Sequence, residues 1–139
     1  MFRTTNIVYL ALFLLLSTNL SHKGKSCFLL YDARVSFTNN LPQNSKPLNL
    51  HCASKNDDLG NHTVGYGESW GFKFCVNPFA TLFYCDLNWG DKSMSVHAFD
   101  GKWYISAHDP CAGNRGNNCA WKVDSDGAKL PKGEVHHWE

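Results

Sequence analysis

An aromatic segment from residue 67 to residue 90, GESWGFKFCVNPFATLFYCDLNWG, leaves this chain few ways to fold. Apolar residues occupy every second position in each half: Trp70, Phe72 and Phe74 in the first, and Phe83, Cys85, Leu87 and Trp89 in the second. Successive side chains of a strand point to opposite faces, so each half predicts a strand that buries one aromatic face. The Asn77-Pro78 break predicts a turn between them, and we expect the two halves to form a hairpin.

Shorter alternating runs flank this segment. They predict strands at residues 33–40, 48–52, 94–99, 102–107 and 119–123, and a short last strand after Asp126-Gly127. Turn-forming residues reverse the chain after residue 52, and Asp100-Gly101 predicts a hairpin between two of the runs. Because no helical period occurs after residue 26, the pattern predicts an all-β fold: a small antiparallel sandwich of seven or eight strands, or a partly closed barrel.

Residues 1–26 are typical of a secretory signal peptide. Arg3 supplies a positive end, an apolar run follows at residues 7–16, and small polar residues come next. Ten apolar residues are too few to span a bilayer, so we expect no stable membrane insertion of the mature chain. Cleavage fits after Ser21 or after Ser26. This organisation predicts a secreted, extracellular protein with one folded domain at residues 33–130 and a polar tail at residues 131–139.

Length and net charge limit the size of the fold and the kinds of partner. The chain has 139 residues, 43% of them hydrophobic, and a formal net charge of +1. This length suits a single domain with a modest core, which we expect to be a monomer. A nearly neutral chain has no large field that would favour nucleic acid.

Six cysteines, Cys27, Cys52, Cys75, Cys85, Cys111 and Cys119, predict disulfides in a secreted chain. Neither a C-x-x-C motif nor a zinc-finger spacing occurs, so we expect no metal and no cofactor. Cys52, Cys85 and Cys119 face the core side of their strands, yet parity leaves fifteen connectivities open. We favour Cys52–Cys119, which would join early and late strands, and Cys85–Cys111, which would fasten the long loop. Cys27 and Cys75 are left to pair with each other, or Cys75 remains a free thiol.

Several strings in fixed order resemble the plant self-incompatibility protein family, the secreted stigmatic S-proteins and their homologues. They are VSFTNNL, LNLHCASKNDDLG, GESWGFKF, TLFYCDLNWG and CAWKVDSDG, spread over residues 33–130. The resemblance implies a disulfide-stapled β-sandwich, secretion, and four shared cysteines that match Cys52, Cys85, Cys111 and Cys119. Cys27 and Cys75 depart from the pattern, as does the tail from Pro131.

Founding members of the family are protein ligands that signal to a membrane receptor on the pollen side. The resemblance therefore implies a secreted, non-enzymatic ligand that recognises a cell-surface receptor, in self-incompatibility or in another signalling process. Binding residues concentrate on loops held by a rigid scaffold, so we expect the receptor-facing residues on predicted turns. The candidates are Tyr66, Asp91, Lys92, Asp100, Lys102 and Arg115. Asn61 begins an acceptor sequon, Asn61-His62-Thr63, which predicts a glycoprotein.

Two other functions deserve a test against the structure. A small hydrolase could use His51, His97 or His108 with a carboxylate, although no motif supplies a nucleophile. A carbohydrate-binding or defence protein could stack sugar on an exposed Trp103 or Trp138. We interpret His51 as a surface histidine, His108-Asp109 as a turn, and Asp57-Asp58-Leu59-Gly60 as a hydrogen-bonded turn rather than a calcium loop. The aromatic set is interpreted as core.

Overall fold

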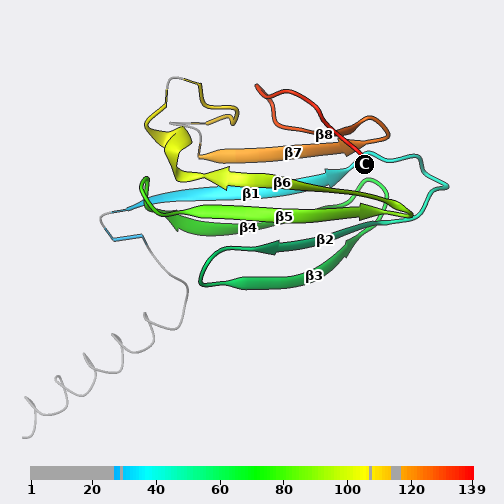
Figure 1. The fold of residues 1–139 in the computed structure, drawn as a ribbon, viewed down its shortest axis with the longest axis horizontal. Coiled ribbons are helices and arrows are strands. Elements are labelled where there is room, and N and C mark those ends of the chain that lie inside the picture. Colours follow the sequence, from blue (N-terminus) through cyan, green and yellow to red (C-terminus); the bar gives the residue numbers. More distant parts are fainter. Residues whose placement is uncertain (1–26, 29, 107, 114–116) are drawn as a thin grey trace, which may run out of the picture.

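The computed structural model describes residues 27–28, 30–106, 108–113 and 117–139. In this part of the chain, two β-sheets stack into a sandwich whose strands follow the long axis of the molecule (Figure 1). The all-β class predicted from the alternating runs is confirmed. No helix in the described ranges is long and apolar enough to cross a membrane. The predicted signal peptide and its cleavage sites lie outside the described residues.

The first sheet has the strand order β4-β1-β7-β8-β9, and the second has the order β3-β2-β5-β6. The elements are β1 (Tyr31–Asn39), β2 (Leu48–Ala53), β3 (Asp58–Val64), β4 (Ser69–Val76), β5 (Leu82–Trp89), β6 (Lys92–Asp100), the 3₁₀ helix η1 (Gly101–Tyr104), β7 (Asn118–Asp124), β8 (Gly127–Lys129) and β9 (His136–His137). Neighbouring strands pair antiparallel except β1 and β7, which are parallel.

The predicted aromatic hairpin is wrong, although both of its strands form. β4 pairs with β1 in the first sheet, whereas β5 pairs with β2 and β6 in the second. The aromatic faces of β4 and β5 therefore meet across the sandwich: the Phe83 ring lies 5.0 Å from the Phe72 ring and 4.6 Å from the Phe74 ring, centroid to centroid. Residues 77–81 carry the chain from one sheet to the other, so two strands with apolar faces can pack without being neighbours in a sheet.

The Asp100-Gly101 hairpin is also wrong. The Asp100 carboxylate accepts a hydrogen bond from the Lys102 amide at 3.0 Å and caps η1 instead of turning the chain into a strand. The Gly101 amide donates to the Thr81 carbonyl at 2.8 Å, and a Cβ at Gly101 would lie 2.7 Å from the Asn77 oxygen. Gly101 is thus required by close packing of η1 on the β4–β5 connection. The true hairpin turn is at residues 90–91, where Trp89 pairs with Lys92.

Two strands were not predicted. The chain does reverse after β2 as expected, but the next residues form β3, whose strand begins at Asp58 within the segment interpreted as a turn. The tail, expected to be unpatterned, forms β9 and pairs with β8. Beyond β9, Glu139 exchanges two backbone hydrogen bonds with Ser93, at 2.9 and 3.3 Å, and so joins the first sheet to the edge of the second. The sandwich is therefore partly closed on this side.

The disulfide pairing differs from the favoured one. The bonds are Cys27–Cys75, Cys52–Cys85 and Cys111–Cys119. Cys52 and Cys85 stand directly opposite each other on β2 and β5, with Cα atoms 4.0 Å apart, while Cys119 lies in the other sheet. Cys111 reaches Cys119 because Ala112 and Asn118 bridge the ends of the loop. Facing parity was right for the three core cysteines, which are fully buried, but it could not say which strands are neighbours.

Candidate functional site

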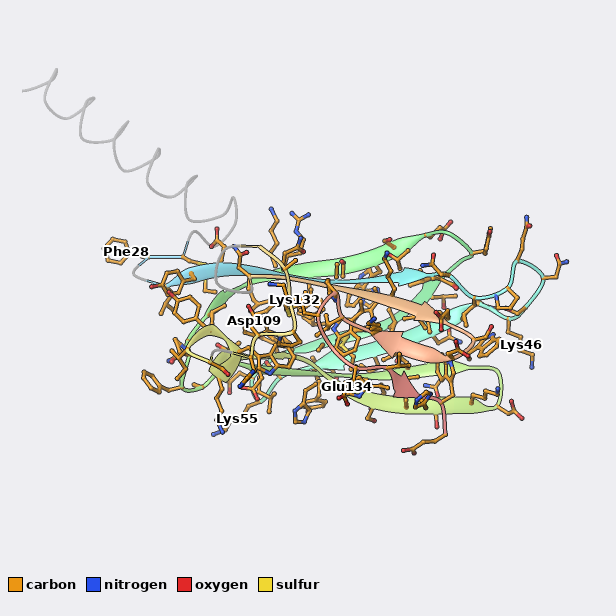
Figure 2. All side chains as sticks on the ribbon, turned by 90° about the horizontal axis from the view of Figure 1, so that it is seen from above. Phe28, Lys46, Lys55, Asp109, Lys132 and Glu134 are labelled. Carbon is orange, nitrogen blue, oxygen red and sulfur yellow. A yellow bond between two sulfur atoms is a disulfide. The ribbon has the colours of Figure 1, made fainter. Side chains whose placement is uncertain are left out.

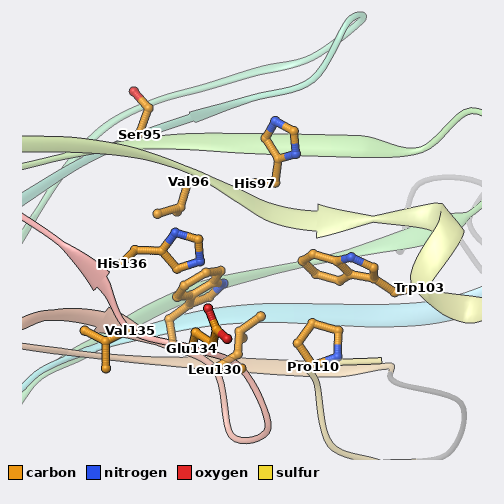
Figure 3. A pocket seen from close by; sticks show the side chains of 11 residues that line it. Ser95, Val96, His97, Trp103, Pro110, Leu130, Glu134, Val135 and His136 are labelled. Carbon is orange, nitrogen blue, oxygen red and sulfur yellow. The ribbon is translucent and has the colours of Figure 1, made fainter. Parts of the chain in front are cut away.

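A cavity of about 610 Å³ opens at the side of the sandwich where β6 faces the tail (Figure 3). Its lining comes from β6, η1, β7, β9 and two loops: Ser95, Val96, His97, Trp103, Pro110, Trp121, Leu130, Gly133, Glu134, Val135 and His136. Trp121 is buried, stacks on Phe37 at 5.8 Å between centroids, and donates its Nε1 hydrogen to the Ala98 carbonyl at 3.1 Å. A tryptophan with its polar atom satisfied makes a rigid base for this cavity.

Trp103 lies on the η1 side of the cavity. Its ring is half-buried and packs edge-on against Phe99, 5.9 Å between centroids. The carbohydrate alternative depended on an exposed Trp103 or Trp138, and neither side chain is fully exposed: Trp138 is half-buried, lies 5.7 Å from Trp89 and donates to the Asp124 carbonyl. Both rings belong to the packing of the sandwich, and only Trp103 contributes to a cavity.

The histidines considered for catalysis are scattered. His51 lies on β2, and its Nε2 atom is 2.6 Å from the Asp58 carboxylate on an exposed sheet surface. His97 lies on β6, and His108 is exposed in the loop before Cys111. The Asp109 carboxylate accepts the Cys111 amide at 2.8 Å, as the turn interpretation predicts. Within the described ranges, this arrangement places no nucleophile beside the His51–Asp58 pair.

The partner that the sequence did not identify for His51 is Asp58. Two hydrogen bonds lower the pKa of the Asp58 carboxyl below its usual 3.8. The bond from the Gly60 amide has the larger effect, and the bond with the His51 ring has the smaller one. The β2–β3 register shifts here, between His51 and Ala53, where β3 has one residue more than β2. Both hydrogen bonds end on the same oxygen, Asp58 Oδ1, and this local bonding favours the hydrogen-bonded turn over a calcium loop.

A metal site is not supported by the cysteines either. Within the described residues, the one cluster with three possible ligand atoms is Cys27, Asp32 and Cys75, and both of its cysteines are joined in a disulfide. A sulfur in a disulfide is not a thiolate ligand.

The structure separates the receptor-facing candidates into two groups at opposite ends of the sandwich. Tyr66, Asp91 and Lys92 lie at the end formed by residues 40–47, 65–68, 90–91 and 125–126, which we call the turn end. Asp100 and Lys102 lie at the other, the η1 end, formed by residues 54–57, 77–81 and 101–106. Figure 2 shows Lys46 at the turn end, with Phe28 and Lys55 at the η1 end. Arg115 lies outside the described residues.

The η1 end carries a surface feature that sequence reasoning missed. Most of the exposed large apolar side chains belong to segments at this end: Phe28, Leu30, Tyr31, Phe79, Leu82 and Ile105. Phe79 is 87% exposed and Ile105 is 62% exposed, on loops fixed by the bond between Gly101 and Thr81. Clustered apolar side chains on a soluble protein mark an interaction surface. The sequence did hold a sign of this surface: Phe79 lies in a turn between two strands, outside the alternating pattern that marks buried side chains.

At the turn end the candidates are differently placed. Tyr66 is 58% exposed. The Lys92 ammonium lies 5.2 Å from the centroid of the Trp89 ring, which holds it against the sheet. Asn61 is exposed on the edge strand β3, where a glycan could be attached without disturbing the core.

The chain is similar to known plant proteins over most of the folded region. A family model described as plant self-incompatibility protein S1 matches residues 34–138, which includes most of the tail. The chain is 37% identical over 90 residues to S-protein homolog 2 of Arabidopsis thaliana, covering 64% of this chain and 54% of that protein. It is 35% identical over 123 residues to self-incompatibility protein S1 of Papaver rhoeas, covering 88% of this chain and 81% of that protein.

The chain spans little more than half the length of the first curated relatives it matches, 54% to 58% of each. One solved structure has a similar fold, with a TM-score of 0.56 at 15% identity over 79% of this chain and 96% of that chain. It represents the self-incompatibility protein homologues, described as a widespread family of small, highly stable, secreted proteins from plants.

Proposed function

Because the chain belongs to the plant self-incompatibility protein S1 family, a family of small secreted plant proteins, we propose that it is a non-enzymatic signalling ligand that binds a receptor on another cell. The family supplies the extracellular setting. The fold supplies a rigid carrier, since three disulfides hold the two sheets and the long loop. We further propose that the mature chain is a monomer.

The observation that carries this proposal is the exposed apolar cluster at the η1 end. Phe79 and Ile105 are exposed on loops whose backbone is held by hydrogen bonds, and Asp100 caps η1, which carries the exposed Lys102. Aromatic anchors surrounded by polar residues are the usual centre of a protein–protein interface. The cluster favours Asp100 and Lys102 over Tyr66, Asp91 and Lys92 as receptor contacts, and Arg115 stays a candidate from the sequence.

An enzymatic role has less support. Hydrolysis needs an acid–base pair and a nucleophile within hydrogen-bond reach in a cleft. His51 and Asp58 meet on an open sheet surface, and the nearby Ser95 hydroxyl donates instead to Asp86. The relatives that match are self-incompatibility S-proteins and their homologues.

The processing of the chain is part of the proposal. We propose that residues 1–26 are a signal peptide, removed after Ser21 or Ser26, and that both sites leave Cys27 for its bond to Cys75. We also propose a glycan on Asn61. Mass spectrometry of protein secreted from plant cells tests both: Asn61→Gln should lower the mass by one glycan, and an N-terminus inside the folded domain would contradict the assignment.

Binding to intact plant cells tests the recognition surface. Fluorescent mature protein would be compared with Phe79→Ser and Lys102→Glu at the η1 end, and with Tyr66→Ser and Lys92→Glu at the turn end. All four side chains are exposed, so each variant should keep its melting temperature. We expect the η1-end variants to bind at least tenfold more weakly and the turn-end variants to change less than twofold. The reverse pattern would move the receptor surface to the turn end.

A further inference from the structure

The edge of β6 presents backbone hydrogen-bonding groups toward the cavity. β6 is the last strand of its sheet, and Ser93 exchanges two backbone bonds with Glu139, so the N–H and C=O of Ser93 point away from β5. In an antiparallel ladder this orientation recurs at every second residue. Ser95 and His97 therefore direct their N–H and C=O groups to the same open edge.

The chain's own tail covers only the first position of this edge. Further back along the tail, His136 and His137 pair with β8 instead. Among the described residues, the backbone hydrogen bonds between the tail and β6 are at Ser93 alone. The open stretch ends at Ala98, whose carbonyl already accepts the indole hydrogen of Trp121. Two residues of β6 thus remain with the geometry of an unpaired strand.

The cavity lies directly beside this open stretch. Ser95 and His97 project from one side of β6 and Val96 from the other (Figure 3), yet all three line the cavity. Neighbouring residues of a strand point to opposite faces, so they can line the same cavity only if the cavity lies against the edge of the strand. The cavity therefore lies against the edge of β6. Trp103, Pro110 and Leu130 supply apolar walls, and the volume of about 610 Å³ can hold a large side chain.

The cavity lining contains one carboxylate, that of Glu134. Glu134 is exposed, and no cation lies within 4 Å of its carboxylate in the part of the chain that the structure describes. In Figure 3 its carboxylate projects toward the same space as the His136 ring. A cation on the occupant would complement it.

We propose that β6 binds an extended segment of a partner protein as an added strand. The segment hydrogen-bonds to the backbone of Ser95 and His97, inserts one large apolar side chain into the cavity, and pairs a lysine or arginine two positions away with Glu134. Added strands gain affinity from main-chain bonds and specificity from side-chain pockets. Assigning this segment to the receptor's extracellular part rests on the proposed function; the binding site itself does not.

Two synthetic peptides, TTKTWTT and TTETWTT, test the site on the ¹⁵N-labelled mature protein. We expect the lysine peptide to shift the amide signals of Ser95 and His97 and to bind at least fivefold more tightly than the glutamate peptide. Ser95→Pro removes the outward N–H, while the matched Ser95→Ala keeps it and loses only the hydroxyl bond to Asp86. Ser95→Pro should weaken binding at least tenfold relative to Ser95→Ala.

Glu134→Lys leaves the β6 backbone intact and should reverse the peptide preference even if Ser95→Pro does not fold. Equal affinities for both peptides, or shifts confined to other strands, would overturn the site. A dimer that Ser95→Pro dissociates would make a second copy the occupant and would also overturn it. Cell binding separates the strand-binding site from the proposed ligand function. If cells bind the Glu134→Lys variant as well as the wild type, the strand-binding site is not the receptor site. If the protein binds the peptide but does not bind cells, only the ligand function is contradicted.

Discussion

Removing the disulfides one at a time should destabilise the protein in an order set by loop length. The Cys52–Cys85 bond closes a separation of 33 residues and the Cys111–Cys119 bond one of 8. In the chain-entropy model these bonds stabilise the fold by about 3.7 and about 2.5 kcal/mol. All four cysteines are fully buried, so alanine pairs lose similar packing at both places, and the difference of about 1.2 kcal/mol remains.

Urea denaturation of the two double variants measures this difference. With an m value of about 1.5 kcal/mol/M, the midpoint should fall by about 2.5 M without Cys52–Cys85 and by about 1.7 M without Cys111–Cys119. An equal or reversed order would refute the loop-length argument. The pairing has its own control: in the single variant Cys52→Ala, peptide mapping should find the free thiol at Cys85, and a free thiol at Cys119 would restore the pairing expected from the sequence.

Three further substitutions test packing and charge by urea denaturation. Trp121→Phe should destabilise by about 2 kcal/mol or more, because the Ala98 carbonyl loses its buried donor; no change would mean that the bond is not formed in solution. Gly71→Ala should destabilise by about 1–3 kcal/mol, because the added Cβ would lie 2.5 Å from the Val35 oxygen; a neutral result would show that β1 and β4 can separate. Since the pKa of Asp58 is lowered in the fold, its stabilisation is present above the usual 3.8 and is lost as pH falls through the lowered pKa. Asp58→Asn should therefore destabilise at pH 7 and match the wild type in strong acid, and a difference that grows on acidification would contradict this sign.

Strand positions could be predicted from the sequence because alternation reports directly which side chains are buried. Val35, Phe37 and Trp121 are in the core as their runs indicate. Pairing could not be predicted in the same way, because β4 and β5 have the same alternation whether they are neighbours in one sheet or face each other across two. That ambiguity also produced the wrong disulfide pairing.

Local turn chemistry was ambiguous for a different reason. Asp100-Gly101 suits a hairpin, but the same carboxylate can cap a helical turn, and contact with residues 77–81 decides between them. β9 was missed because two residues are too few to show a period, and the tail gains its structure from Ser93 and β8.

The candidate site was predictable only in part. Loop residues such as Tyr66 and Lys102 are exposed as expected, but their separation to opposite ends depends on strand direction over the whole chain. The cavity beside β6 could not be foreseen, since its lining comes from β6, η1, β7, β9 and two loops, and their placement depends on the whole fold.

Saturable binding of the labelled mature protein to intact plant cells tests the central claim most directly. The account predicts saturation, competition by unlabelled protein, and loss of binding after the cells are treated with protease, because the proposed receptor is a membrane protein. Disulfide-reduced protein is the matched control and should not bind, since the loops lose their scaffold. Binding that is linear in concentration, or unaffected by protease, would contradict the claim that this protein is a receptor ligand.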